Sequence, residues 1–515
     1  MKINKLFTLF LFFTITISAQ EEGEADIPVE VKMTEVFKDK RKFTNMAFST
    51  EDGKEGVVIG RRYKKGYYIE HYDKNINLVK NFDFEVDKRR GAIEKAFISD
   101  GKLCLIEYLY NKKSKKLEYY SNISPLDKFS FKRELLLSTP LKDVKRGFGF
   151  FGFGNDVDGD VLGDFYISKN QEYIAATLDI KNKDSETHRL FVFNNKLEKV
   201  FQTEFKRGIK DRKFRLQNID VDERDGTVYL LGKSFPREKR KKKEGGKYQY
   251  ELYKINGSKK QSLIFDSGEN FVGSLTTVIN DGKLLCVGFY SERNDSRYKG
   301  LAYFDVDANE MQLKNSVYSP FTKQFILDKY GKNKDKELRN ISIRDIHITE
   351  NNECILNAEE FFITTHFMSN PNGGGSTYYI YHFRDIISTK MDTNGKLLWA
   401  RNINKKQAAR YYSPYLSYTS TYYDGKSYFF INCSDKVKKL RNDRLQFKGV
   451  KTKKSNLYVI TLDESGNFEY KKILDDKDSV VPFAVGRGYL NNNGEDIIFQ
   501  GRKGRKKQVM KLSLK

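Results

Sequence analysis

The chain has 515 residues and a strong positive charge, with 93 Lys and Arg against 69 Asp and Glu, or +24 at neutral pH. Its mean hydropathy is −0.65, and no stretch after residue 20 is apolar enough to span a bilayer, which excludes a polytopic membrane protein. Eight Pro are too few for a Pro-rich linker, whereas 14% aromatic residues and many Asp-Gly and Asn-Gly turns are typical of β-strands.

The first nineteen residues have the three parts of a signal peptide. Lys2 and Lys5 form a positive region, an apolar run follows from Leu6 to Ile17, and Ala19 offers a small residue at the cleavage site. The run has about twelve residues, whereas a membrane span needs about twenty, so a cleaved signal fits better than an anchor. The Gln after the cut is typical of bacteria. We therefore expect export to the periplasm, the cell surface or the medium.

One pattern recurs along the rest of the chain: an apolar strand, a turn, a second apolar strand, a polar loop and a hairpin. The copies are Phe43–Val86, Gly91–Leu136, Asp164–Phe205, Phe214–Phe265, Phe271–Asn315, Ile341–Arg401, Ser413–Leu474 and one that begins near Pro482. Four strands per copy at a period of about forty to sixty residues are the pattern of a β-propeller, because such small sheets bury both faces only by stacking around an axis. We expect one all-β domain, residues 20–515, with eight blades, or seven if one copy is an insertion.

The last copy is incomplete, and this predicts how the ring closes. Glu495–Gly501 and Gln508–Leu514 supply its second and third strands, and then the sequence ends. The unpaired segment Val29–Phe37 alternates apolar and polar residues, so it can supply the fourth strand and cover the open edge. The alternative is an open solenoid with a frayed N-terminal arm.

Two insertions, residues 145–163 and 316–340, interrupt the repeats. In the second, Phe321–Tyr330 has apolar residues at helical spacing, which predicts a short amphipathic helix. In and just after the first, carboxylates cluster as the hard oxygen ligands that Ca²⁺ prefers. These candidate ligands are Asp156, Asp158, Asp160 and Asp164. Val161 and Ile167 stand where an EF-hand needs Gly and Glu, so the alternative is a solvated turn, and no other cofactor is expected.

One hairpin has a sequence that is similar to a known repeat. Asp385–Arg401 contains Lys390, Asp392, Gly395 and Trp399 at the spacing of the exported bacterial β-propeller-repeat proteins, which it resembles. Residues 320–475 share further pieces with such proteins, so the resemblance covers about a third of the chain. It implies the fold, with Trp399 wedged against the neighbouring blade, but no activity. Quinoprotein propellers repeat a similar hairpin in most blades, so its single occurrence argues against a quinone cofactor.

The four cysteines each follow a turn, within or at the end of an apolar run. They are Cys104, Cys286, Cys354 and Cys433. Because equivalent strands of different blades diverge, their Cα atoms cannot approach to the roughly 7 Å that a disulfide allows. We expect four buried free thiols.

Catalytic motifs are not recognisable. The five His have no metal-ligand spacing, and neither a nucleophile elbow nor a P-loop occurs. His366 and His382 flank a Gly-rich loop near Glu359 and Glu360, so these four residues either form a site or lie in solvated loops.

Positive charge gathers in the loops that join the second and third strands of copies one, two, four, seven and eight. The predicted binding residues there are Arg61, Arg62, Lys112, Lys113, Lys241, Lys242, Lys438, Lys439, Arg441, Lys503 and Arg505. The other turns hold Asp52, Asp100, Asp225, Asp281, Asp305, Asp392, Asp424 and Asp463. The two sets of turns leave a propeller on opposite sides, so we expect one strongly basic face. Such a field attracts an acidic polymer or an anionic membrane surface, or else it only maintains solubility.

These patterns predict a non-enzymatic, monomeric binding or scaffold propeller of the bacterial cell envelope. Its expected partner is an envelope protein or an anionic polymer or surface, whereas nucleic acid is an implausible physiological ligand for an exported protein. The alternative function is a hydrolase or lyase that acts on acidic polysaccharide.

Overall fold

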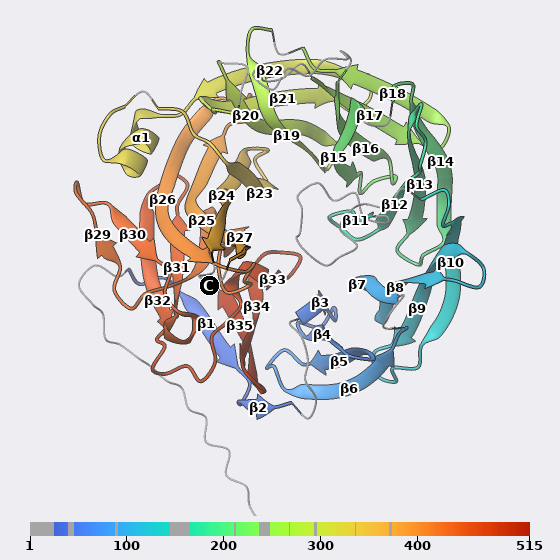
Figure 1. Ribbon diagram of the computed structural model, residues 1–515, viewed down its shortest axis with the longest axis horizontal. Coiled ribbons are helices and arrows are strands. Elements are labelled where there is room, and N and C mark those ends of the chain that lie inside the picture. The colour runs from blue at the N-terminus through green and yellow to red at the C-terminus, as the bar shows by residue number, and fades with distance from the viewer. Residues whose placement is uncertain are drawn as a thin grey trace, which may run out of the picture.

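The computed structural model describes residues 25–39, 46–87, 91–144, 164–210, 213–235, 248–266, 268–292, 296–334, 336–369 and 373–515. Within these ranges the chain forms eight antiparallel sheets around a central axis, which confirms the eight-bladed propeller (Figure 1). In each blade the first strand lies nearest the axis and the fourth lies at the rim. We number the blades from the N-terminus.

The first four blades are regular meanders of four strands. Blade 1 contains β3 (Met46–Glu51), β4 (Val57–Tyr63), β5 (Gly66–Tyr72) and β6 (Leu78–Glu85). Blade 2 contains β7 (Gly91–Ser99), β8 (Lys102–Asn111), β9 (Lys116–Pro125) and β10 (Lys132–Pro140). Blade 3 contains β11 (Asp164–Ile167), β12 (Tyr173–Asp179), β13 (Glu186–Asn194) and β14 (Lys199–Arg207). Blade 4 contains β15 (Phe214–Val221), β16 (Val228–Ser234), β17 (Gln249–Asn256) and β18 (Lys259–Ile264).

Blades 5 to 7 carry the additions to the basic plan. Blade 5 contains β19 (Phe271–Asn280), β20 (Lys283–Ser291), β21 (Gly300–Asp307) and β22 (Gln312–Pro320). Blade 6 contains β23 (Ile341–Ile348), β24 (Cys354–Ser369), β25 (Gly375–Met391) and β26 (Leu397–Ala409), extended by β30 (Leu445–Lys448) and β29 (Lys438–Lys439). Blade 7 contains β27 (Tyr418–Tyr423), β28 (Lys426–Cys433), β31 (Asn456–Leu462) and β32 (Phe468–Leu474). Single turns of 3-10 helix lie at Thr452–Lys454 (η3) and Val485–Arg487 (η4).

The ring closes as predicted, by pairing the two ends of the chain. Blade 8 contains β33 (Tyr489–Leu490), β34 (Asp496–Lys503) and β35 (Lys506–Leu514) from the C-terminus, and β1 (Val29–Met33) and β2 (Phe37–Lys38) from the N-terminus. Val29 pairs with Leu514 and Met33 with Met510, and the ribbons of β1 and β35 lie side by side in Figure 1. The N-terminal strand therefore covers the edge that the C-terminal strands leave open.

The core is divided among the blade junctions. Each of the eight junctions holds one cluster of buried apolar side chains. The cysteines lie on the second strands β8, β20, β24 and β28, and all four are buried and free, as predicted. Burial raises the pKa of Cys104, Cys286 and Cys354 to about 12, so these thiols stay protonated.

Two local predictions are confirmed beside blade 6. Helix α1 (Lys323–Tyr330) begins after Thr322, whose hydroxyl accepts the backbone N–H of Phe325, and ends at Gly331, which has a positive φ of 70°. Trp399 is 9% exposed and donates its indole N–H to the carbonyl of Glu464 in blade 7 at 2.8 Å. This tryptophan therefore wedges blade 6 against its neighbour. None of the helices in the described ranges has the length and apolar character that crossing a membrane requires.

Candidate functional site

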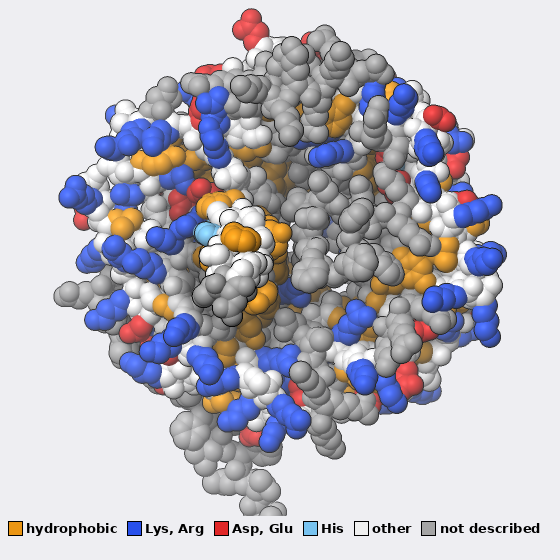
Figure 2. Space-filling model, viewed as in Figure 1, with side chains coloured by type: hydrophobic (Ala, Val, Ile, Leu, Met, Phe, Trp, Pro, Cys, Tyr) orange, Lys and Arg blue, Asp and Glu red, His pale blue; other side chains and the backbone are white. Residues whose placement is uncertain are grey.

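The two sides of the disc are built from different connections. Because each blade is an antiparallel meander with its first strand innermost, the second-to-third connections leave on one side and the other turns of the blade on the opposite side. We call the first side the basic face; its loops include Tyr63–Gly66, Asn111–Lys116, Cys433–Asn456 and Lys503–Lys506. The other side is the turn face. Lys and Arg side chains are spread around the face shown in Figure 2.

Most of the predicted binding residues lie exposed on the basic face. They are Arg62, Lys112, Lys113, Lys438, Lys439, Arg441, Lys503 and Arg505. Lys241 and Lys242 fall outside the described residues. Within the described ranges, the seven other than Arg62 form no ion pair, so the fold does not use their charges.

The assignment of Arg61 to the basic face is wrong. Its side chain is 1% exposed, and its Nε and Nη1 donate to Glu70 at 2.9 Å and Asp39 at 2.8 Å. Lys507, also buried, contacts Asp39 at 2.9 Å and Glu70 at 3.1 Å. Successive residues of a strand point to opposite sides, so Arg62 reaches solvent while Arg61 enters the junction of blades 8 and 1. We call Asp39, Arg61, Glu70 and Lys507 the closure cluster.

Several acids of the turn face serve the fold, whereas Asp100, Asp281 and Asp424 are exposed. Asp392 accepts the backbone N–H groups of Asn394 and Lys396, both at 2.9 Å, and so closes its own turn. The same arrangement recurs in other turns, at Asp73, Asp307 and Asp463. The prediction that Asp305 lies in a turn is wrong. Asp305 lies within strand β21 and pairs with Lys283 at 3.3 Å.

A long hairpin on the basic face escaped the sequence reasoning. Strands β24 and β25 have 16 and 17 residues, and their outer halves extend beyond the neighbouring strand β23 as a two-stranded ribbon. Hydrophobic side chains gather near the centre of Figure 2, where Figure 1 places these strands. The available signal was the run from Phe361 to Phe383, which has no acidic residue and many aromatic ones.

The two histidines of this hairpin meet, but not with the predicted carboxylates. The Nε2 atoms of His366 and His382 each lie 2.9 Å from the hydroxyl of Thr364. Glu359 is instead fully buried, and Glu360 pairs with Lys329 of helix α1 at 2.9 Å. The histidine pair and the glutamates therefore belong to different surroundings.

Among the described residues, those that could hold a metal lie in blade 3. Asp164 accepts the hydroxyl of Tyr166 at 3.3 Å, while the other three calcium candidates, Asp156, Asp158 and Asp160, lie outside the described residues. Sequence reasoning missed a different group: Asp179, Glu186 and His188 have ligand atoms within 4.8 Å of one another. The register that pairs Asp179 with His188 across β12 and β13 brings them together. The calcium site stays a prediction.

Three carboxylates on inner strands, Glu51, Glu94 and Asp220, have raised pKa values. Burial raises the pKa of Glu94 on β7 to about 7 and that of Asp220 on β15 to about 6, because the charged form loses hydration. Asp220 accepts the backbone N–H of Ile279 at 2.9 Å, so it links blade 4 to blade 5. This contact gives Asp220 a structural role.

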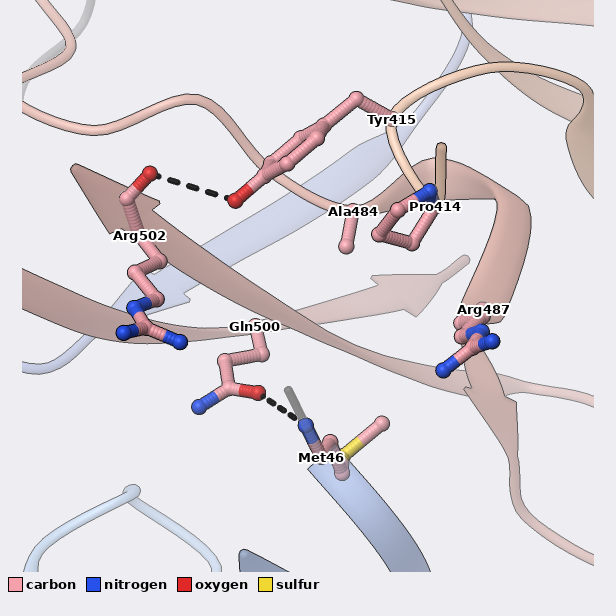
Figure 3. A pocket seen from close by; sticks show the side chains of 7 residues that line it. All are labelled: Met46, Pro414, Tyr415, Ala484, Arg487, Gln500 and Arg502. Atoms are coloured by element: carbon pink, nitrogen blue, oxygen red, sulfur yellow. Dashed lines mark hydrogen bonds between the residues drawn. The ribbon is translucent and has the colours of Figure 1, made fainter. Parts of the chain in front are cut away.

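A small pocket lies where blades 1 and 8 meet the segment between blades 6 and 7 (Figure 3). Its volume is about 10 Å³, and it is lined by Met46, Pro414, Tyr415, Ala484, Arg487, Gln500 and Arg502. The backbone N–H of Met46 donates to Gln500 at 2.7 Å, and the hydroxyl of Tyr415 donates to the carbonyl of Arg502 at 3.3 Å. The space suits about one water molecule.

A larger groove lies beside helix α1. It has a volume of about 410 Å³ and is lined by Lys299, Pro320, Phe321, Lys323, Ile326, Asn333, Lys334 and Lys336. Four of these residues are lysines. The repulsion of Lys332 and Lys336 holds the pKa of Lys334 below its usual value, because these lysines crowd together after helix α1.

Chains similar to this one are found among solved structures. No protein family and no curated protein matches this chain. The chain is similar to the Dos1 propeller, with 8% identity over 94% of this chain and 95% of that one and a TM-score of 0.43. It is also similar to the β-propeller domain of the Trilobed protease from Pyrococcus furiosus, with 12% identity over 86% and 99% and a TM-score of 0.36. Prolyl oligopeptidase B from Galerina marginata has 10% identity over 90% of this chain and 56% of that one, with a TM-score of 0.37.

Proposed function

We propose that this protein is a non-enzymatic binding propeller of the bacterial cell envelope, which engages an anionic partner through its basic face. The observation that carries the proposal is the difference in charge use between the two sides of the disc. Acids such as Asp392 and Asp463 of the turn face hydrogen-bond their own turns, whereas the exposed cations of loops such as Asn111–Lys116 and Lys503–Lys506 have no such structural role.

A field of this kind recruits anions over a distance. Each basic side chain near an anionic surface contributes about 1 kcal/mol, and several of them add up over one face. Blades 7, 8, 1 and 2 are consecutive in the closed ring, and each carries a basic loop, so their loops form one continuous arc. The signal peptide predicted at residues 1–19 supports the envelope location, and Lys-rich loops that only maintain solubility are the opposing explanation.

The proposal is tested by the salt concentration at which the protein elutes from immobilised heparin, a polyanion of known chemistry. One variant neutralises four basic-face charges to Gln: Lys436, Lys438, Lys439 and Arg441. The matched control neutralises four exposed lysines of the turn face to Gln: Lys54, Lys74, Lys102 and Lys426.

We expect the basic-face variant to bind heparin at least about a hundredfold more weakly at moderate salt, since about 1 kcal/mol is lost per charge. The control should elute close to the wild type, although its net charge equals that of the basic-face variant. Equal losses in both variants, or elution of the wild type at low salt, would show that the charge serves solubility only.

A further inference from the structure

The projecting part of the β24–β25 hairpin differs from every other described hairpin in this propeller. Nine cross-strand pairs, from Phe361 with Phe383 to Ser369 with Gly375, belong to it. Strand β26 accompanies only the first three, as far as the pair of Tyr381 with Ala409. We call the segments Phe361–Ser369 and Gly375–Phe383 the aromatic ribbon.

The aromatic ribbon exposes apolar side chains on both of its faces. Ile363, Phe367 and Tyr379 share one face and are 47%, 69% and 51% exposed, and Met368 on the other face is 50% exposed. No acidic residue occurs in the ribbon, although 31% of the chain is charged. Monomeric proteins rarely expose a contiguous apolar surface unless it binds something.

The base of the ribbon is held firmly, so its projection is a feature of the fold. The buried carboxylate of Glu359 receives hydrogen bonds from Lys405 at 2.6 Å, Ser417 at 2.7 Å and Arg344 at 3.1 Å. On the other side, Lys329 of helix α1 pairs with both Glu360 and Asp385. These contacts fix strands β24 and β25 where they leave the sheet.

Cations surround the aromatic side chains. The guanidinium of Arg410 lies over the ring of Tyr378 at 4.8 Å, and that of Arg384 over Phe362 at 5.9 Å. Arg487 lies over Tyr412, which in turn contacts Phe383 at the base of the ribbon. The ribbon therefore combines uncharged aromatic strands with an arginine collar, on the same face as the basic loops.

This combination identifies the occupant. The face of Ile363 and Phe367 is apolar, whereas the opposite face carries Met368 beside the hydrogen-bonded histidines. A fluid lipid surface offers acyl chains to the first face and polar headgroups to the second, which a flat protein surface does not. Tyr rings favour the headgroup level and Phe rings the boundary between headgroups and acyl chains. The arginine collar, which consists of Arg384, Arg410 and Arg487, suits anionic headgroups. Beyond the ends of β23 and β26, each strand of the ribbon has one edge that no other strand covers. The hydrocarbon core does not tolerate the unpaired backbone groups of such edges, so the ribbon stays in the interfacial layer.

We infer that the aromatic ribbon inserts into the headgroup region of an anionic lipid bilayer while the basic loops contact the same surface. This inference rests on the proposed function and names its partner.

The experiment measures sedimentation of the protein with phosphatidylcholine vesicles that contain or lack phosphatidylglycerol. The ribbon variant is I363S/F367S/Y379S, and the matched control V79S/L135S/I264S removes three outer-strand residues that are 59%, 56% and 54% exposed. We expect the ribbon variant to bind phosphatidylglycerol vesicles at least about tenfold more weakly than the wild type and the control. Its elution from heparin should not change.

A tryptophan at the tip reports insertion directly. In Phe367→Trp, fluorescence should shift to shorter wavelength with phosphatidylglycerol vesicles, because the only native tryptophan, Trp399, is already buried. Absence of that shift, or full vesicle binding by the ribbon variant, would overturn the inference. If the wild type binds heparin but does not bind phosphatidylglycerol vesicles, the inference is overturned and the proposed function stands. A ribbon-dependent dimer in sedimentation velocity would assign the surface to a second copy instead.

Discussion

The turn face and the basic face carry charged residues for different reasons. On the turn face, carboxylates such as Asp392 and Asp463 are hydrogen-bonded to backbone N–H groups of their own turns, so their charge is part of the fold. On the basic face, Lys112, Lys438 and Lys503 extend into solvent. Charge that the fold uses is costly to remove, whereas exposed charge can be removed with little effect on stability and remains available to a partner.

The hairpin of β34 and β35 carries both kinds of charge within five residues. Lys503, Arg505 and Lys506 are exposed, whereas Lys507 is buried in the closure cluster against Asp39 and Glu70. Among the residues that the structure describes, the junction of blades 8 and 1 also has the smallest apolar cluster of the eight, so its charges carry a larger share of the contact between the chain ends. Similar residues next to one another in sequence therefore have opposite roles.

The largest expected effect comes from Lys507→Met. Removal of this ammonium leaves two buried carboxylates with Arg61 as their remaining partner in the cluster, so the free energy of unfolding should fall by about 3 kcal/mol. Chemical denaturation measures this change. The triple variant Lys503→Ser, Arg505→Ser, Lys506→Ser should stay within about 0.5 kcal/mol of the wild type but elute earlier from heparin. A stable Lys507→Met protein would show that the closure cluster does not hold the ring.

A smaller effect is expected on the turn face. Asp392→Ala removes the acceptor for two backbone N–H groups and should lower the free energy of unfolding by about 1 kcal/mol, while heparin binding is unchanged. Asp392→Asn keeps an acceptor oxygen at this position and should recover most of the loss. Weaker heparin binding by the alanine variant at a temperature where it is folded would contradict the separation of the two faces.

The smallest effect is a pH dependence at Asp307. Hydrogen bonds from the backbone N–H groups of Glu310 and Asn309 hold its pKa below the ordinary value of 3.8. A carboxyl whose pKa is lower in the folded than in the unfolded state contributes stability above its ordinary pKa, and this contribution disappears as the pH falls through the folded value. Asp307→Asn should therefore lose less in Tm than the wild type between about pH 5 and about pH 3. Parallel curves for the two proteins would contradict this.

The amino-acid sequence by itself determined the architecture. Strand alternation and turn residues act over a few neighbours, so eight copies of the pattern were enough to predict the blades. The incomplete last copy predicted closure by Val29–Phe37, and the four cysteines were placed by the turns that precede them. The basic loops were also recognisable, because the order of strands in a meander decides the side on which each loop leaves the disc.

Only the tertiary structure decided which charged side chains are exposed and so available to a partner. Arg61 and Lys507 look like their neighbours Arg62 and Lys506, but the second and third strands of a blade have other blades on both sides, and one residue of each pair points into the junction. The ribbon of β24 and β25 has an uncharged, aromatic sequence, which is equally typical of strands buried in a sheet. Whether a neighbouring strand covers it depends on where β23 and β26 end, and this is a property of the assembled blade.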